Sequence, residues 1–268
     1  MIRFVRPAAP AAFGRGIQKP RPKGPFDAKV WRTHKGAFSR SQHGKCGYCE
    51  TYVAGTQDGD VEHYAPKGGV HDVAAAGRGI EAEPGLPRLK RGSRKTIRRC
   101  NTGYWWRAYE WNNFLFACSV CNGKYKRMVF PLDPVPPVRW KPMAGDAAHR
   151  PLLLNCFDDD QPWRHFQYTP DSGEISGTTL RGTATIDTCG LHRETLRIDR
   201  RRATRDALGL CNEIIAAELR GRVHGRDWWV ALRERGGDER PFAGAVRAVA
   251  EARLGLRWAE IVAVAGAL

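Results

Sequence analysis

Two short segments, Cys46-Gly-Tyr-Cys49 and Cys118-Ser-Val-Cys121, decide the fold that this sequence predicts. Each Cys-x-x-Cys turn lets two thiolates converge on one metal ion, and two such turns complete a tetrahedron around zinc. Four protein ligands leave no open position on the ion, so the sequence predicts a structural zinc knuckle that does not touch substrate. A redox-active Cys-x-x-Cys is the alternative, but two copies separated by a long insert argue against it.

The composition favours a globular protein with a polyanionic partner. The chain has 268 residues, of which 42% are hydrophobic, enough for one sizeable domain or two small ones. Its formal net charge of +16 is typical of proteins that bind nucleic acid. With no long apolar run and no secretory signal, we expect a cytoplasmic protein without membrane contact. Four further cysteines are expected to be buried apolar side chains or incidental thiols: Cys100, Cys156, Cys189 and Cys211.

Three polar segments are tied in sequence to the two cysteine pairs. Residues 61–67 (VEHYAPK) lie between the pairs, residues 103–115 (GYWWRAYEWNNFL) precede the second pair, and residues 122–127 (NGKYKR) follow it. A shared zinc ion would draw all three into one pocket. Taken singly, Glu62 could be a solvated strand carboxylate, Asn113 a turn residue and Asn122 a helix cap. Taken together, they favour one shared pocket beside the zinc site.

The order of these segments resembles the HNH nuclease superfamily, and most of all the HNH subunit of Septu-type and retron-associated antiphage systems. The resemblance covers about residues 45–132 and is weaker over 151–205, where PLLLNCFDDDQPWRHFQY and TIDTCGLHRETLRIDRRR echo the same subgroup. It implies an α+β fold with a ββα-metal core around the zinc knuckle. The expected parts are a basic arm and helix (1–44), the nuclease core (45–132) and a mostly helical C-terminal region (133–268).

The resemblance also implies a role for each polar residue. His63 would be the general base that activates a water, because a neutral imidazole suits that task. Glu62 and Asn122 would hold one Mg²⁺ or Mn²⁺ ion, which stabilises the transition state and the leaving oxygen. Asn113 would pin the loop between the two strands by backbone hydrogen bonds and so orient His63. The basic residues expected at phosphates are Lys67, Lys124, Lys126 and Arg127.

The chain departs from the family pattern at three places. Many HNH proteins have Asp in place of Glu62 and His in place of Asn122, and both replacements here keep an oxygen donor. The stretch from Asn122 to Pro131 is also one residue longer than the pattern. Either Lys124 or Lys126 can therefore fill the usual lysine position.

A basic insert precedes the second cysteine pair. Residues 85–107 contain no acidic residue, and we expect this run to contact phosphates near the cleavage site through Arg94, Lys95, Arg98 and Arg99. A solvated loop is the alternative. The aromatic residues of 104–111 are expected to stack bases or, in the interpretation we favour, to pack the zinc core.

The flanking regions carry simpler patterns. We expect an extended surface arm over residues 1–25, a helix over 27–44, strands with a turn at 170–173 within 151–186, and helices from 191 onward, one of which stops at Gly255. The apolar residues Ile214, Ile215 and Leu219 would either pack on the nuclease core or dock an ATPase partner.

The sequence thus predicts a metal-dependent HNH endonuclease, acting on DNA in antiphage defence. A zinc-knuckle module that binds nucleic acid without catalysis is the main alternative. A nuclease that stays silent until a partner assembles with it is the third.

Overall fold

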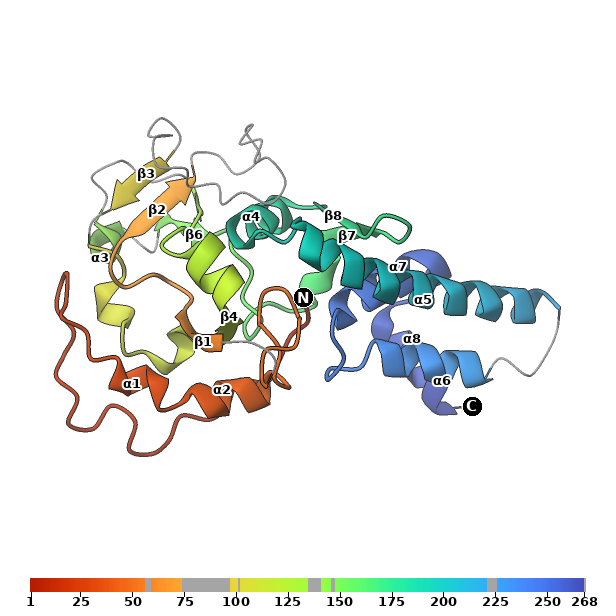
Figure 1. Cartoon of the computed structure of the whole chain (residues 1–268), viewed down its shortest axis with the longest axis horizontal. Helices are drawn as coiled ribbons and strands as arrows, with labels where there is room; N and C mark the ends of the chain where they lie inside the picture. The colour runs from red at the N-terminus through yellow and green to blue at the C-terminus, as the bar shows by residue number, and fades with distance from the viewer. Residues whose placement is uncertain are drawn as a thin grey trace.

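The structure is a computed structural model that describes residues 1–55, 59–73, 97–100, 102–134, 141–145, 148–220 and 226–267. It combines helices with small two-stranded sheets, so the predicted α+β class is confirmed. The elements of the first half gather at one end of the molecule, and the long helix α5 (Glu194–Leu219) leads from them towards the C-terminal helices (Figure 1). In the described part of the chain, no helix has the length and apolar character needed to cross a membrane.

Two antiparallel strands followed by a helix form the centre of the first half. Strand β1 (Gly59–His63) pairs with β4 (Phe114–Cys118), with His63 opposite Phe114. Every residue of β4 is buried, which explains its unbroken apolar sequence. The second cysteine pair spans the end of β4 and the start of η3 (Val120–Lys126), a helix of the π type. That these elements form a ββα-metal core stays a prediction.

The N-terminal region differs from its prediction in two respects. The expected helix over 27–44 is two short helices, α1 (Lys29–Arg32) and α2 (Lys35–Ser41). The break coincides with Thr33, whose hydroxyl donates to Lys29 O at 2.9 Å and so competes with the helical backbone bonds. The predicted surface arm holds for residues 5–25, which are exposed or half-buried and form no helix or strand. Its first residues differ: Met1, Ile2 and Phe4 are buried, and Phe4 N donates to Cys156 O at 2.7 Å.

Short sheets and helices connect the two halves. The turn predicted at 170–173 is confirmed, because it joins β7 (Phe166–Thr169) to β8 (Glu174–Gly177). The strand-like pattern does not continue beyond β8: Thr179 caps α4 (Leu180–Cys189) by accepting from Gly182 N at 3.1 Å. The other small elements are β2 (Val70–Val73) paired with β3 (Ile97–Cys100), β5 (Leu132–Asp133) paired with β6 (Arg150–Pro151), η1 (Trp105–Arg107), η2 (Trp111–Asn113), α3 (Pro142–Gly145) and η5 (Pro162–His165).

The C-terminal region is helical, as predicted. Helix α5 packs against α6 (Arg226–Arg235) and α7 (Ala243–Leu254), and α8 (Trp258–Ala267) packs on α6 and α7. Helix α7 stops at Gly255, whose φ of +69° is the left-handed conformation expected of a C-terminal glycine. On α5, Ile214 is buried and Ile215 half-buried, whereas Leu219 is 84% exposed. Most of the apolar face of α5 therefore packs inside the molecule.

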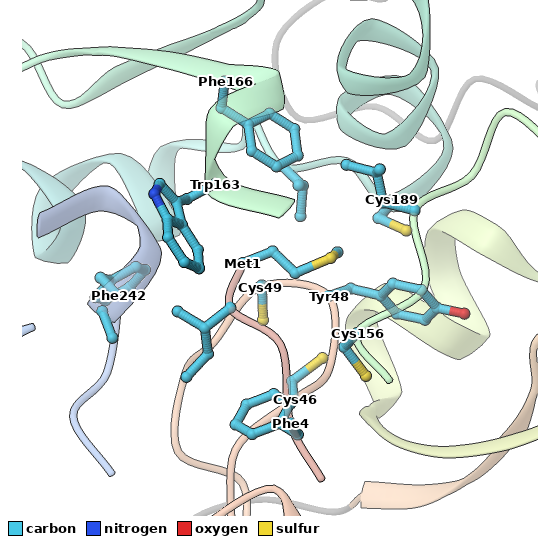
Figure 2. Packing of buried hydrophobic residues seen from close by; sticks show 14 of the residues in the cluster. Met1, Phe4, Cys46, Tyr48, Cys49, Cys156, Trp163, Phe166, Cys189 and Phe242 are labelled. Carbon is cyan, nitrogen blue, oxygen red and sulfur yellow. The ribbon is translucent and has the colours of Figure 1, made fainter. Parts of the chain in front are cut away.

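One hydrophobic core runs through all three predicted parts of the chain. Met1, Cys46, Trp163 and Phe242 belong to the same buried cluster, and they lie close together in Figure 2. Polar bonds also cross the predicted boundaries, because Lys45 Nζ donates to Arg240 O at 2.7 Å. The division at 44/45 and 132/133 stays a prediction.

Candidate functional site

The four cysteines of the two pairs converge on one point. The Sγ atoms of Cys46, Cys49, Cys118 and Cys121 all lie within 4.8 Å of one another, and all four residues are buried. The Cys49 and Cys118 sulfur atoms are 3.9 Å apart. A tetrahedron with Zn–S distances of about 2.3 Å has edges of about 3.8 Å, so this spacing fits a zinc ion. The cluster therefore has the composition and size of a structural zinc site.

Neighbouring donors already point at these sulfur atoms. Cys121 N donates to Cys118 Sγ at 3.3 Å, and the Thr51 hydroxyl lies 3.1 Å from Cys49 Sγ. Such bonds favour the thiolate form that metal binding requires. The lone cysteines Cys156, Cys189 and Cys211 are buried and outside this cluster, as predicted, while the side chain of Cys100 lies outside the described residues.

His63 ends β1 and is only 5% exposed. Its Nε2 lies 2.9 Å from Ala108 O, and because a carbonyl can only accept, Nε2 carries the ring proton. Nδ1 is then the acceptor, and Lys67 Nζ lies 3.3 Å from it. Burial, followed by the charge of Lys67, lowers the pKa of His63 to about 3. The imidazole is therefore neutral at physiological pH, with its lone pair on Nδ1.

Asn113 holds the backbone around His63. Its Oδ1 accepts from Ala65 N at 2.8 Å, and its Nδ2 donates to Ala65 O and to Arg107 O, both at 3.0 Å. Its own carbonyl accepts from Tyr64 N at 2.8 Å. The backbone bonds that the resemblance implies for Asn113 are thus present, and they tie the segment after β1 to the segment before β4. Its part in catalysis stays a prediction.

Glu62 points to a different partner from His63. Its carboxylate forms a buried ion pair with Lys126, whose ammonium also donates to His63 O at 3.0 Å. Burial raises the pKa of Glu62, and the charge of Lys126 opposes that rise. Asn122, the other expected metal ligand, lies half-buried on η3 directly after Cys121. The side-chain partner of Glu62 is thus Lys126 and not Asn122.

Helix η3 has a π-helical turn after Asn122. Arg127 N donates to Asn122 O at 2.8 Å, a bond across five residues instead of the four of an α-helix. This wider turn leaves Lys124 exposed and buries Lys126 completely. Lys126 therefore contacts Glu62 and His63 O, and which of the two lysines meets a phosphate stays a prediction. The complete burial of Lys126 differs from the open phosphate contact expected from the sequence.

Two side chains at the site had no functional role in the sequence analysis. The Trp31 ring meets the His63 ring edge-on at 4.7 Å, and Lys67 Nζ lies 4.5 Å from the Trp31 ring centre. Arg193 donates to Cys121 Sγ at 3.5 Å from α5's N-terminal end. Trp31 carried only the signal of an apolar helical position, and Arg193 lies in the stretch 151–205 of weaker resemblance without a role of its own.

The structure describes only some of the other basic side chains that were predicted to contact phosphates. Arg127 is exposed at the end of η3. Arg98 and Arg99 lie on β3, paired with Asp72 and His71 of β2, but their side chains fall outside the described residues. Arg94 and Lys95 also lie outside the described residues. The aromatic residues Tyr104, Trp106, Tyr109 and Trp111 pack on or within the core, which agrees with the favoured interpretation.

Comparison with known proteins gives one informative match. The chain is 30% identical over 186 residues to the Septu protein PtuB of Bacillus mycoides (strain KBAB4). The aligned part is 69% of this chain and 55% of that protein, so the chain spans about half the length of the curated relative. No protein-family model and no solved structure matches the chain. The similarity therefore identifies the chain as related to a Septu protein.

Proposed function

We propose that the chain is a metal-dependent endonuclease of the HNH class that cleaves DNA. The observation that supports this most is the state of His63. The Ala108 carbonyl holds the ring proton of His63 on Nε2, so Nδ1 is the ring atom left to accept a proton. Asn113 fixes the backbone that carries this ring. A module that only binds nucleic acid has no need of such an arrangement.

In this proposal His63 Nδ1 takes the proton from the attacking water. Lys67, whose ammonium lies at Nδ1 in this structure, is close enough to move onto a phosphate oxygen once substrate is present. Glu62 and Asn122 would hold Mg²⁺ or Mn²⁺, which supplies positive charge to the transition state and the leaving oxygen. For Glu62 to serve in this way, its ion pair with Lys126 has to open.

The similarity to a Septu protein extends the proposal to the biological setting. We propose that the chain takes part in antiphage defence as the nuclease of a Septu-type system, together with an ATPase partner. The net charge of +16 supports a nucleic-acid substrate. A cytoplasmic location remains part of the prediction.

The test is a cleavage assay with Mg²⁺ or Mn²⁺ on DNA and RNA, run with the chain alone and with the products of neighbouring genes. His63→Ala should slow cleavage by roughly two to four orders of magnitude, the usual contribution of a positioned general base, while nucleic-acid affinity changes little. Asn122→Ala should also lose cleavage, with partial recovery in excess Mn²⁺. His165→Ala, a histidine outside the site, is the matched control.

Two results would overturn the proposal. Wild-type protein that shows no metal-dependent cleavage under any of these conditions would leave the non-catalytic binding module. A His63→Ala variant that cuts at the wild-type rate would remove the assigned base. Cleavage that appears only with a partner would instead identify a nuclease that assembly activates.

A further inference from the structure

The junction between α4 and α5 is a sequence feature that the proposed chemistry does not use. Residues 188–193 (TCGLHR) comprise the last two residues of α4 and the four residues that lead into α5. Their last member, Arg193, is 7% exposed and approaches the cysteine cluster. Both terminal nitrogens of its guanidinium lie 3.5 Å from Cys121 Sγ.

The orientation of Arg193 is fixed by its own neighbourhood. Its Nη1 also donates to Cys189 O at 3.2 Å and to Gly190 O at 3.0 Å. A guanidinium is planar and permanently charged, so these carbonyl contacts aim its remaining N–H groups at the sulfur. Four thiolates around Zn²⁺ leave two surplus negative charges in a buried place, and Arg193 supplies one compensating positive charge there.

The same junction also contacts the helix that carries the catalytic candidates. Gly190 has a φ of +61°, and a Cβ at this position would stand 2.2 Å from the Tyr125 ring. The Arg193 guanidinium lies 5.7 Å from the centre of that ring. Tyr125 is on η3, next to Lys126 and three residues after Asn122. The junction thus touches η3 at two points, one at its cysteine and one at its aromatic ring.

We infer that Arg193 is a positioning residue of the zinc site, which holds the Cys121 thiolate on the metal and ties η3 to the α4–α5 junction. Two charge-assisted hydrogen bonds from Arg193 hold the Cys121 sulfur in place and offset part of the negative charge of a site with four thiolates. Arg193 therefore slows the loss of zinc. The inference depends on zinc occupying the four-cysteine cluster and does not depend on nuclease activity.

The experiment measures zinc release from the purified full chain into 4-(2-pyridylazo)resorcinol, without nucleic acid. Arg193→Met should release zinc roughly ten- to a hundredfold faster than wild type, the usual cost of losing a partner of a metal ligand. Arg193→Lys keeps the charge but loses the double donation, so its rate should lie between the two. In parallel, mass spectrometry after brief alkylation should find Cys121 modified first in Arg193→Met.

Arg200 offers a matched control on the same helix. It is also buried, and it donates to Gly173 O at 2.7 Å and Leu191 O at 2.9 Å, but it makes no bond to a cysteine. Arg200→Met should lower the melting temperature and leave the rate of zinc release from folded protein unchanged. If Arg193→Met does not fold, the comparison rests on Arg193→Lys against Arg200→Lys. Equal release rates for the Arg193 and Arg200 variants would overturn the inference.

Discussion

Burial of His63 has two effects: it keeps the ring neutral, and it makes the stability of the protein depend on pH. Enclosure between Trp31 and Phe114, with Lys67 at Nδ1, keeps the ring neutral because a second proton would add charge in a desolvated place beside an ammonium. The same enclosure makes unfolding sensitive to acid. The unfolded chain protonates this histidine near pH 6.5, whereas the folded chain does so only near pH 3.

We therefore expect acid to destabilise the wild type more than a His63→Gln variant. Between pH 6.5 and 3 the unfolded state binds more protons than the folded state, so the unfolding free energy falls as the pH falls. The difference between wild type and variant should shrink by about 1.4 kcal/mol per pH unit in this window. Protonation of the zinc thiolates affects both proteins alike. Urea titrations at several pH values test this, and parallel pH slopes would contradict the pKa of His63.

For single residues, the sequence predicted the positions that belong to a motif and missed the side-chain contacts that depend on packing. The neighbouring positions of Glu62, His63 and Asn113 around one cysteine pair indicated a common pocket, and β1 and β4 bring them together. The burial of Lys126 could not be predicted, because the sequence does not reveal the geometry of the turn after Asn122. Arg193 carried no signal, since its partner is a sulfur atom far away in the chain.

The π-helical η3 gives its two lysines opposite roles. Lys126 has its ammonium buried on Glu62, whereas Lys124 is exposed. Lys126→Met would leave a buried carboxylate without its cation, so we expect a loss of about 3 to 5 kcal/mol in unfolding free energy. Lys124→Met should change it by less than about 0.5 kcal/mol. Thermal melts of both variants provide the measurement.

The same pair of variants reports on the proposed metal ligand. If Glu62 binds a divalent ion, Mn²⁺ should replace the missing ammonium and raise the melting temperature of Lys126→Met more than that of wild type or Lys124→Met. An equal response of all three proteins would speak against Glu62 as a metal ligand.

Two glycines at helix ends allow packing to be separated from backbone strain. Gly190 after α4 and Gly255 after α7 both have positive φ, but only Gly190 faces a close neighbour, the Tyr125 ring. We expect Gly255→Ala to cost about 1 to 2 kcal/mol, the price of the left-handed conformation. Gly190→Ala should cost a further ~1 to 3 kcal/mol from overpacking. Chemical denaturation of both variants measures the two losses in unfolding free energy. Equal losses would mean that the Tyr125 ring moves aside without cost.

At the element scale, periodic patterns predicted the existence of helices better than their ends. The apolar spacing over 27–44 was real, but Thr33 divides it into α1 and α2. Residues 180–186 fell within the stretch 151–186 that was expected to hold strands, because Ile, Thr and Ala in a short run do not distinguish a helix from a strand. A local capping bond from Thr179 and the packing of α4 on β8 and η3 settle this segment as helix.

The molecule as a whole is held together by contacts between its distant parts. Glu50, next to the first cysteine pair, accepts from Gly244 N at 3.2 Å, and Lys45 reaches Arg240 O. Sequence reasoning left open whether the C-terminal helices pack on the nuclease core or dock a partner. Their buried residues Trp229, Phe242 and Val246 belong to the common core, which supports the first alternative.

A truncated chain that ends at residue 221 should therefore neither fold nor bind zinc fully. Removing α6, α7 and α8 exposes core side chains and takes away the groups that bond to Lys45 and Glu50. We expect little folded protein and less than one zinc ion per chain. A chain that ends at Gly255 loses only α8 and should keep its zinc with a lower melting temperature. Full zinc content in the shorter chain would show that the knuckle folds by itself.

The wide turn of η3 bears on how sequences of this kind can gain or lose a residue. Gly123 and Lys124 are exposed on this turn, whereas Lys126 is buried on Glu62, so the extra residue expected from the resemblance fits at the exposed positions. An extra residue at this turn leaves the positions of the buried side chains unchanged, although it changes the number of residues between Asn122 and the lysine. Removing Gly123 should contract the turn to α-helical form and leave Lys126 three residues after Asn122 on a tighter helix. Alignments that match such chains by residue number alone would therefore pair the wrong lysines.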